Sequence, residues 1–350
     1  MAKVRVGVIG CGVIGKVHAK MVAESAQAEL AAVADVREDM AQQAAKEFGA
    51  ARVYGAAEAL LDDRNVDAVI VALPTNIRTP IALKSLAAGK HTLIEKPIAM
   101  NASDVRRIIA ARGDLVAGCC SARLSLMPSS LAAAQFISSG ALDALRVVRI
   151  RAIIPAGKKP EKDPPPWRLN RSLNGGGILM NWGCYDLDFA LSLTGWTLKP
   201  RTVFAQTWGV APQLMPYVAA GSSAESHFAA LIACDGGAAI TFERGEYVAA
   251  PSDMAWQVIG AAGSVRMQMT PKTAKEVYHD FIAPDGVQTK VIWSGDEEGI
   301  MQHRFVVEDF ISAVRERRAP HTSLERALLV QRISDAIYES AASGKAVNLA

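Results

Sequence analysis

The chain has 350 residues, half of them apolar, and this length predicts two domains rather than a single core. Charged residues make up 21 % of the chain and leave a net charge of +3, which argues against nucleic acid or a membrane surface as a partner. No apolar run reaches the ~18 residues that a membrane helix needs, and five cysteines without metal or disulfide spacing favour reduced thiols in a cytoplasmic protein.

Residues 1–122 alternate short apolar runs with helical stretches, which is typical of parallel strands buried on both faces. The first run contains Arg5 and several glycines and lacks a clean cleavage site, so it predicts a buried strand rather than a signal peptide. Asn101 or Ser103 is the expected cap of the last helix. We expect strands at residues 4–9, 30–34, 66–72, 92–94 and 115–118, and helices at residues 14–26, 38–48, 78–88 and 103–111.

After Arg123 the sequence changes to strand-like alternation interrupted by the turn sequences DGG, AAG and PDG. This pattern predicts an α+β domain, residues 123–350, with a large, open, mostly antiparallel sheet that helices cover on one face. We expect strands at residues 146–153, 202–207, 226–233, 238–244, 254–259, 264–269 and 275–283, and helices at residues 129–138, 302–317 and 323–343.

The sequence VIGCGVIG places Gly10, Gly12 and Gly15 in the G-x-G-x-x-G spacing between a strand and a helix. Gly10 permits the tight turn, Gly12 lets the backbone approach a pyrophosphate, and Gly15 lets the helix pack closely on the strand. The helix N-terminus offers N–H groups and a positive dipole to the phosphates. Asp35 ends the next strand, where it can accept both ribose hydroxyls and would repel a 2′-phosphate, so the sequence favours NAD. Arg37 keeps NADP open, and a Rossmann-like fold that binds another nucleotide is the alternative.

The sequence AGKHTLIEKP puts Glu95, Lys96 and Pro97 at the carboxyl end of the fourth expected strand. In a doubly wound sheet the carboxyl ends of the strands face the ligand crevice, so Lys96 is expected near the nicotinamide. A solvated surface lysine is the alternative for any single Lys. The six histidines are scattered and none forms a metal-spaced pair with another His or Cys, so we expect no metal.

Taken together, these motifs resemble the family of glucose–fructose oxidoreductase and inositol dehydrogenase, the Gfo/Idh/MocA-type oxidoreductases. The resemblance covers nearly the whole chain and includes the glycine motif, LPTN, AGKHTLIEKP, SARLS, WRLN, the GGG helix and the closing FISAVRERRAP. It implies an N-terminal Rossmann domain that binds NAD and a second domain that binds the substrate and joins the copies of a homodimer or homotetramer. It also implies a dehydrogenase of sugars or cyclic polyols, with a cis bond before Pro97 that aims the Lys96 side chain.

The family pattern G-G-G-x-x-x-D-x-G-x-H-x-x-D overlaps the sequence GGGILMNWGCYDLD with two departures. Asn181 stands where Asp is usual and Tyr185 where His is usual, whereas Asp188 fits. On a helix Asn181 and Tyr185 share a face, and this polar stripe among apolar residues favours a catalytic cleft over a solvated surface. Some relatives carry Tyr here, so Tyr185 is our candidate for proton transfer. A free phenol has a pKa near ~10, but a nearby Lys96 and an oxidised nicotinamide would favour phenolate.

These motifs and the resemblance lead us to assign acid–base catalysis to Lys96 and Tyr185. Trp167 and Arg168 match family positions near cofactor and substrate, although a stacked Trp and a surface Arg are an equal alternative. The expected cofactor-binding residues are Gly10, Cys11, Gly12, Val13, Ile14, Gly15, Asp35, Arg37, Leu73, Pro74, Thr75, Asn76, Glu95, Lys96, Pro97, Arg123, Trp167 and Arg168. The expected substrate-binding residues are Lys96, Arg123, Trp167, Arg168, Asn181 and Tyr185.

Three functions are compatible with these residues. The first is an NAD-dependent dehydrogenase of a sugar, glycoside or cyclic polyol, in which Tyr185 takes the hydroxyl proton with help from Lys96. The second keeps NAD tightly bound and recycles it while a glycoside is oxidised, undergoes elimination or transfer, and is reduced again. The third is a regulator that senses NAD and a sugar without catalysis, which the two departures at Asn181 and Tyr185 make conceivable.

Overall fold

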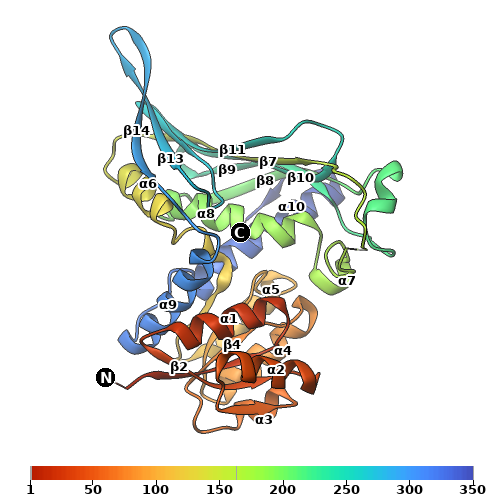
Figure 1. Cartoon of the computed structure of the whole chain (residues 1–350). Helices are drawn as coiled ribbons and strands as arrows, with labels where there is room; N and C mark the ends of the chain where they lie inside the picture. The colour runs from red at the N-terminus through yellow and green to blue at the C-terminus, as the bar shows by residue number, and fades with distance from the viewer. Residues whose placement is uncertain (1, 163, 350) are drawn as a thin grey trace. The chain divides into compact units, whose positions relative to one another are not determined.

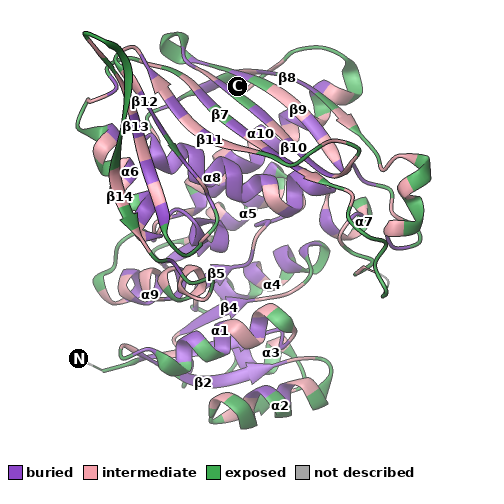
Figure 2. Ribbon diagram, turned by 45° about the horizontal axis from the view of Figure 1, so that its top comes forward, coloured by how far each residue is buried: buried purple, intermediate pink, exposed green. Residues whose placement is uncertain are grey.

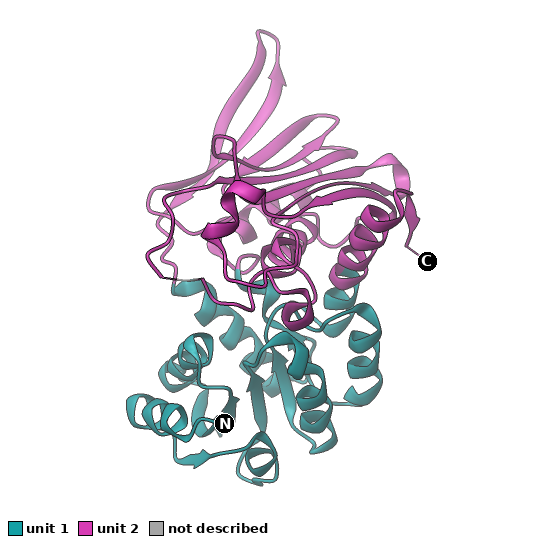
Figure 3. Cartoon of the chain, turned by 90° about the vertical axis from the view of Figure 1, so that its right-hand side faces the viewer, with its two compact units in different colours: residues 1–123, 300–329 teal, residues 124–299, 330–350 magenta. Residues whose placement is uncertain are grey.

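The computed structural model describes residues 2–162 and 164–349. The chain divides into two compact units, each assembled from two segments of the sequence (Figure 3). The first unit runs to Arg123 and takes in Ile300–Leu329, and the second unit takes in Leu124–Gly299 and the residues from Val330 onward. This division differs from the expected boundary, which placed all residues from 123 to 350 in the second domain.

The segment Ile300–Leu329 belongs to the first unit because it packs on the helices and strands of that unit. The helix α9 (Met301–Glu316) contacts α1 (Val13–Glu24) and β1 (Val4–Ile9). After α9 the chain pairs with the edge of the first sheet, where the Cys119 N–H donates to the Thr322 carbonyl at 3.0 Å.

The first unit is built on a six-stranded parallel sheet with the order β3-β2-β1-β4-β5-β6. This is the doubly wound order that the sequence predicts, so the expected fold class of this part is confirmed. Besides β1, α1 and α9, its elements are β2 (Ala28–Ala34), α2 (Glu38–Phe48), β3 (Arg52–Tyr54), α3 (Ala57–Leu61), β4 (Ala68–Val71), α4 (Thr75–Ala87), β5 (His91–Ile94), α5 (Ala102–Arg112), β6 (Ala117–Cys119) and the 3₁₀ turn η1 (Cys120–Arg123).

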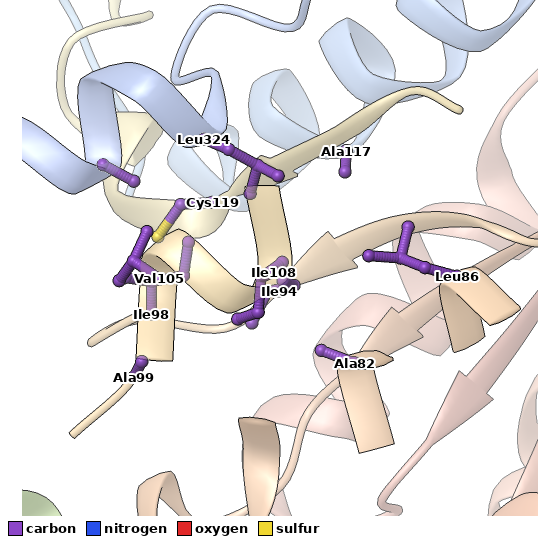
Figure 4. Close-up of a cluster of buried hydrophobic side chains, with 11 residues drawn as sticks. Ala82, Leu86, Ile94, Ile98, Ala99, Val105, Ile108, Ala117, Cys119 and Leu324 are labelled. Carbon is purple, nitrogen blue, oxygen red and sulfur yellow. The ribbon is translucent and has the colours of Figure 1, made fainter. Parts of the chain in front are cut away.

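The strands of this sheet are apolar because helices cover both of their faces. All four residues of β4 are buried, as the purple colour of this strand shows in Figure 2. Figure 4 shows one of the resulting cores, in which Ile94 of β5 packs among Ile98, Val105 and Ile108. Burial of each such aliphatic side chain contributes roughly 1.5–3 kcal/mol, so this core holds β5 and α5 together.

The second unit contains a nine-stranded sheet with the order β14-β13-β12-β11-β7-β10-β9-β8-β15. Every pair of neighbours is antiparallel except β7 and β10, which confirms the mostly antiparallel sheet expected here. The strands are β7 (Leu145–Pro155), β8 (Pro200–Trp208), β9 (His227–Cys234), β10 (Ala239–Val248), β11 (Asp253–Gly260), β12 (Gly263–Met267), β13 (Lys275–Ala283), β14 (Gly286–Gly295) and β15 (Val347–Asn348).

Helices cover one face of this sheet, as Figure 1 shows for α6, α8 and α10. A hydrogen bond from the Ala205 N–H to Ser340 Oγ at 2.9 Å ties β8 to α10. The other face carries exposed apolar side chains, including Phe204 and Leu231. The helical segments are α6 (Pro128–Ser138), α7 (Arg171–Asn174), the π-helix η2 (Leu179–Gly183), α8 (Cys184–Leu193), the 3₁₀ turns η3 (Pro212–Tyr217) and η4 (Asp235–Gly237), and α10 (Leu324–Ser343), which begins in the first unit.

Most expected elements lie within a few residues of their predicted bounds, and Asn101 is the cap of α5, accepting the Asp104 N–H. The helix α4 begins at Thr75, three residues before its expected start, so Thr75 and Asn76 of the LPTN sequence lie in its first turn and Pro74 is its N-cap. The elements that were not predicted include β3, α3, α7, β14 and β15. Among the described helices, none combines the length and the apolar character that crossing a bilayer would require.

Candidate active site

The glycine turn after β1 has the conformation and the close contacts that its three glycines permit. Gly10 has φ +93°, and a Cβ there would lie 2.5 Å from the Ala72 carbonyl oxygen. A Cβ on Gly15 would lie 1.8 Å from the Gly10 carbonyl oxygen, so α1 can approach the turn only with glycine at this position. Gly12, the N-cap of α1, has open space where its Cβ would be. This opening at a helix N-terminus fits a pyrophosphate.

Asp35 lies directly after β2, beside the glycine turn. Its Oδ2 accepts the Cys11 N–H at 2.7 Å and its Oδ1 accepts the Arg37 N–H at 2.9 Å. Two backbone donors thus orient a half-buried carboxylate that can still accept ribose hydroxyls. Burial, with a smaller effect of Asp35, raises the pKa of the Cys11 thiol to about 11, so this side chain stays neutral. Together with Gly12, these groups fit the pyrophosphate and ribose of a dinucleotide.

Lys96 follows β5, and a buried carboxylate holds its backbone. The Lys96 N–H donates to Glu95 Oε2 at 2.9 Å, and the bond to Pro97 is cis, as expected. The other oxygen, Glu95 Oε1, accepts the Arg123 Nη2–H and lies 2.7 Å from His18 Nε2. Glu95, Arg123 and His18 are all buried. Arg123 thus contacts this network, and its expected contact with cofactor or substrate stays a prediction.

His18 is a neutral partner in this network. Complete burial, together with the charge of Arg123, lowers its pKa well below the ordinary value, so its Nε2–H donates to Glu95. One ligand atom each from His18, Glu95 and Cys120 lie within 4.8 Å of one another, a grouping that could hold a metal ion. The Arg123 guanidinium already donates to the same carboxylate oxygen, and its charge would disfavour a cation. The absence of a metal stays a prediction.

Three side chains around Lys96 were not predicted from the sequence, namely the buried His18 and Arg78 and the half-buried His303. His18 lies three residues after Gly15 on the otherwise apolar buried face of α1, and a polar residue on such a face is the signal that could have identified it. His303 lies on α9, and burial, followed by the charges of Arg123 and Lys96, lowers its pKa to about 3. No local sequence pattern connects α9 with β5.

In the second unit, packing explains the glycine run that precedes Asn181. A Cβ on Gly176 would lie 1.9 Å from the Tyr338 hydroxyl oxygen, and a Cβ on Gly177 would lie 1.8 Å from the Glu225 carbonyl oxygen. The buried Glu225 carboxylate accepts the N–H groups of Gly177 at 3.0 Å and Leu179 at 3.1 Å, and the Tyr338 hydroxyl at 2.8 Å. This carboxylate therefore anchors the start of η2.

The expected α-helix through Asn181 begins as the π-helix η2 and becomes α-helical only from Cys184. Asn181 and Tyr185 are both buried, with exposed fractions of 7 % and 6 %. The Tyr185 ring meets the Trp182 ring edge-on, with centroids 5.6 Å apart. A π-helical turn is uncommon and is frequent at functional sites, which supports a functional role for this segment.

The carboxylates that follow Tyr185 have structural partners. Asp186 accepts hydrogen bonds from Arg244 at 2.7 Å and from Trp256 Nε1 at 2.9 Å, and burial raises the pKa of its carboxyl group. Asp188, which fits the family pattern, accepts the Ser125 hydroxyl at 2.7 Å. These contacts assign both carboxylates to the interior of the second unit.

Trp167 and Arg168 lie in the second unit, before α7. Trp167 is 44 % exposed, and Arg168 is paired with the buried Glu246 at 2.5 Å. The first unit thus brings together the glycine turn, Asp35, Glu95 and Lys96, and the second unit carries Asn181 and Tyr185. The roles of these residues, and the pairing of Lys96 with Tyr185, stay predictions.

Comparisons with known proteins agree with this geometry. Residues 4–114 match the family described as an oxidoreductase family with an NAD-binding Rossmann fold, and residues 130–266 match the GFO/IDH/MocA C-terminal domain. The chain is 32 % identical to a myo-inositol 2-dehydrogenase of Thermotoga maritima, over 55 % of each chain. It is 33 % identical to a D-glucoside 3-dehydrogenase of Escherichia coli, over 55 % of this chain and 54 % of the relative. The chain thus spans about half the length of these curated relatives.

A solved structure of levoglucosan dehydrogenase in complex with NADH and levoglucosan superposes with a TM-score of 0.85 at 22 % identity, covering 99 % of each chain. At this identity the likeness concerns the fold alone. The two matched domains follow each other in the same order as the two sheets described above. The chain therefore belongs to the Gfo/Idh/MocA oxidoreductase family, and its first domain is an NAD-binding Rossmann fold.

Proposed function

We propose that the protein is an NAD-dependent oxidoreductase that transfers a hydride between a CH–OH group of a sugar, glycoside or cyclic polyol and nicotinamide. One observation carries the proposal: three neighbouring strands, β1, β4 and β5, end at the same edge of the first sheet. The glycine turn follows β1, the LPTN turn follows β4, and Lys96 follows β5. Ligands of doubly wound sheets bind at this edge, so Lys96 is available to a substrate beside the dinucleotide.

In this proposal the bound cofactor supplies the hydride acceptor, the nicotinamide C4, and the residues of the chain handle the proton and the orientation. Tyr185, as phenolate, takes the proton of the substrate hydroxyl. The Lys96 ammonium favours that phenolate by its charge. Asn181 orients the hydroxyl by hydrogen bonding, since an amide carries no charge to contribute. Asp35 and the backbone at Gly12 hold the dinucleotide.

The substrate class rests on the relatives together with the chemistry of the site. Two relatives are named for myo-inositol and for a D-glucoside, both rings that carry several hydroxyl groups. A ring of this kind suits a site in which an amide and a phenol bind adjacent hydroxyls. The match to the NAD-binding Rossmann family model supports NAD as the cofactor, and Asp35 supports NAD over NADP because its charge would repel a 2′-phosphate.

The experiment compares the wild type with Lys96→Ala and Tyr185→Phe on a panel of sugars, polyols and glycosides with NAD. We expect turnover to fall by at least ~100-fold in each variant, as measured by NADH absorbance. Lys46→Ala and Tyr217→Phe, at positions outside the proposed site, are the matched controls. Full activity in both site variants would refute the assignment. Substrate conversion without accumulation of NADH would instead support the recycling enzyme.

A further inference from the structure

Arg78, which lies in the first turns of α4, is a buried cation that contacts two loops at once. Its side chain is 5 % exposed. The Nε–H donates to the Leu73 carbonyl at 3.0 Å, the Nη2–H donates to the same carbonyl, and the Nη1–H donates to the Pro97 carbonyl. A guanidinium carries five N–H donors in a planar fork, and this geometry allows one side chain to bridge two separate acceptors.

The two acceptors belong to the loops that follow neighbouring strands. Leu73 lies between β4 and α4, and Pro97 comes directly after Lys96, beyond the end of β5. The guanidinium therefore joins the LPTN turn to the EKP turn at the edge of the sheet where the dinucleotide is proposed to bind. Moving a charged group from water into the protein interior costs free energy. A buried guanidinium is therefore retained only where hydrogen bonds compensate for its lost contacts with water.

Lys96 is thus held through its backbone from both sides. On one side its N–H donates to Glu95 Oε2, and Arg123 and His18 hold the other oxygen of that carboxylate. On the other side Arg78 binds the carbonyl of Pro97, one residue further along the chain. The side chain of Lys96 extends from a backbone whose neighbours on both sides are hydrogen-bonded to buried charges.

We propose that Arg78 is a positioning residue that sets the orientation of Lys96 toward the reacting hydroxyl. The proposal rests on the proposed function, because it concerns the reaction in which Lys96 acts. Lysine in place of Arg78 would keep the charge, but it lacks the planar fork whose separate nitrogens bind the two carbonyls in a fixed geometry. Even a 1 Å misplacement of a catalytic group can cost about 100-fold in rate.

A double-mutant cycle tests the proposal with wild type, Arg78→Lys, Lys96→Ala and the double variant. We expect Arg78→Lys to lower kcat about 10- to 100-fold, to shift the pH profile and to raise the solvent deuterium isotope effect. In the Lys96→Ala background the same substitution should change kcat by less than about 2-fold, since the two residues act through one group. Arg106→Lys, on the exposed face of α5, is the matched control. An equal loss in both backgrounds overturns the proposal, while a large effect of Lys96→Ala alone leaves the proposed function intact.

A second readout does not depend on activity. Reductive methylation with ¹³C-formaldehyde gives each lysine an NMR signal, and the signal that Lys96→Ala removes is that of Lys96. We expect this signal to shift or broaden in Arg78→Lys and to stay in place in Arg106→Lys. If Arg78→Lys does not fold, Arg78→Gln, whose amide can bind one carbonyl, takes its place. An unchanged Lys96 signal in a folded variant overturns the positioning role.

Discussion

At the scale of single residues, the hydrogen bonds of Asp63 predict how the free energy of unfolding depends on pH. Burial opposes ionisation of this carboxyl group, but hydrogen bonds from the Asn65 N–H, Arg52 and Tyr54 outweigh burial and lower its pKa to about 2. A folded-state pKa below the unfolded value of ~3.9 means that the stabilisation is fully present above that value and is lost as pH falls toward 2. Urea unfolding should show the free energy of unfolding declining between about pH 4 and pH 2. Asp63→Asn should flatten this decline, and an equally steep decline in the variant would contradict the assignment.

The site residues divide into those with a local sequence pattern and those without one. The three glycines, Asp35 and Lys96 were predictable because each lies at a fixed distance from a strand end. His18 and Arg78 were not, since their importance comes from contacts with Glu95 and with two carbonyls that only the tertiary structure brings near. A charged residue among the buried positions of a helix indicates only that its side chain has a partner, and it does not identify that partner.

At the scale of elements, we predict that the junction between the glycine run and η2 does not tolerate a side chain at Gly177. A Cβ on Gly177 would lie 1.8 Å from the backbone oxygen of Glu225, and backbone cannot move aside as a flexible side chain can. We expect Gly177→Ala to lower the free energy of unfolding by about 1–3 kcal/mol, measured by urea denaturation. Gly209→Ala is the control, because nothing lies within 4 Å of its Cβ position. Equal stability of the two variants would show that the junction relaxes.

Strands and helices whose apolar residues recur with a clear period were predictable from the sequence, and elements without such a period were not. Both faces of the strand β14 are largely exposed, so it shows no alternation of apolar and polar residues. The short strand β3 has three residues, too few for a pattern. The π-helical start of the segment through Asn181 also has no sequence pattern, because the Glu225 carboxylate that anchors it comes from a loop some fifty residues later.

At the scale of the whole molecule, the uncovered face of the nine-stranded sheet bears on oligomerisation. Leu231 and Phe204, on the neighbouring strands β9 and β8, are 52 % and 47 % exposed. The family resemblance predicts a homodimer or homotetramer joined through this sheet. Leu231→Glu should therefore lower the mass found by sedimentation velocity, whereas Leu131→Glu, an equally exposed leucine on α6, should leave it unchanged. A monomeric wild type would refute the predicted assembly.

The order of the two units along the chain has a consequence for biosynthesis. The first unit needs α9 against α1 and the pairing of Thr322 with Cys119, yet these residues leave the ribosome only after the entire sheet of the second unit up to β14. Until then the nascent nucleotide-binding half lacks α9, which contacts both α1 and β1. Ribosome-bound chains that end before Ile300 should therefore be digested by protease within this half, and chains that extend past Leu329 should resist.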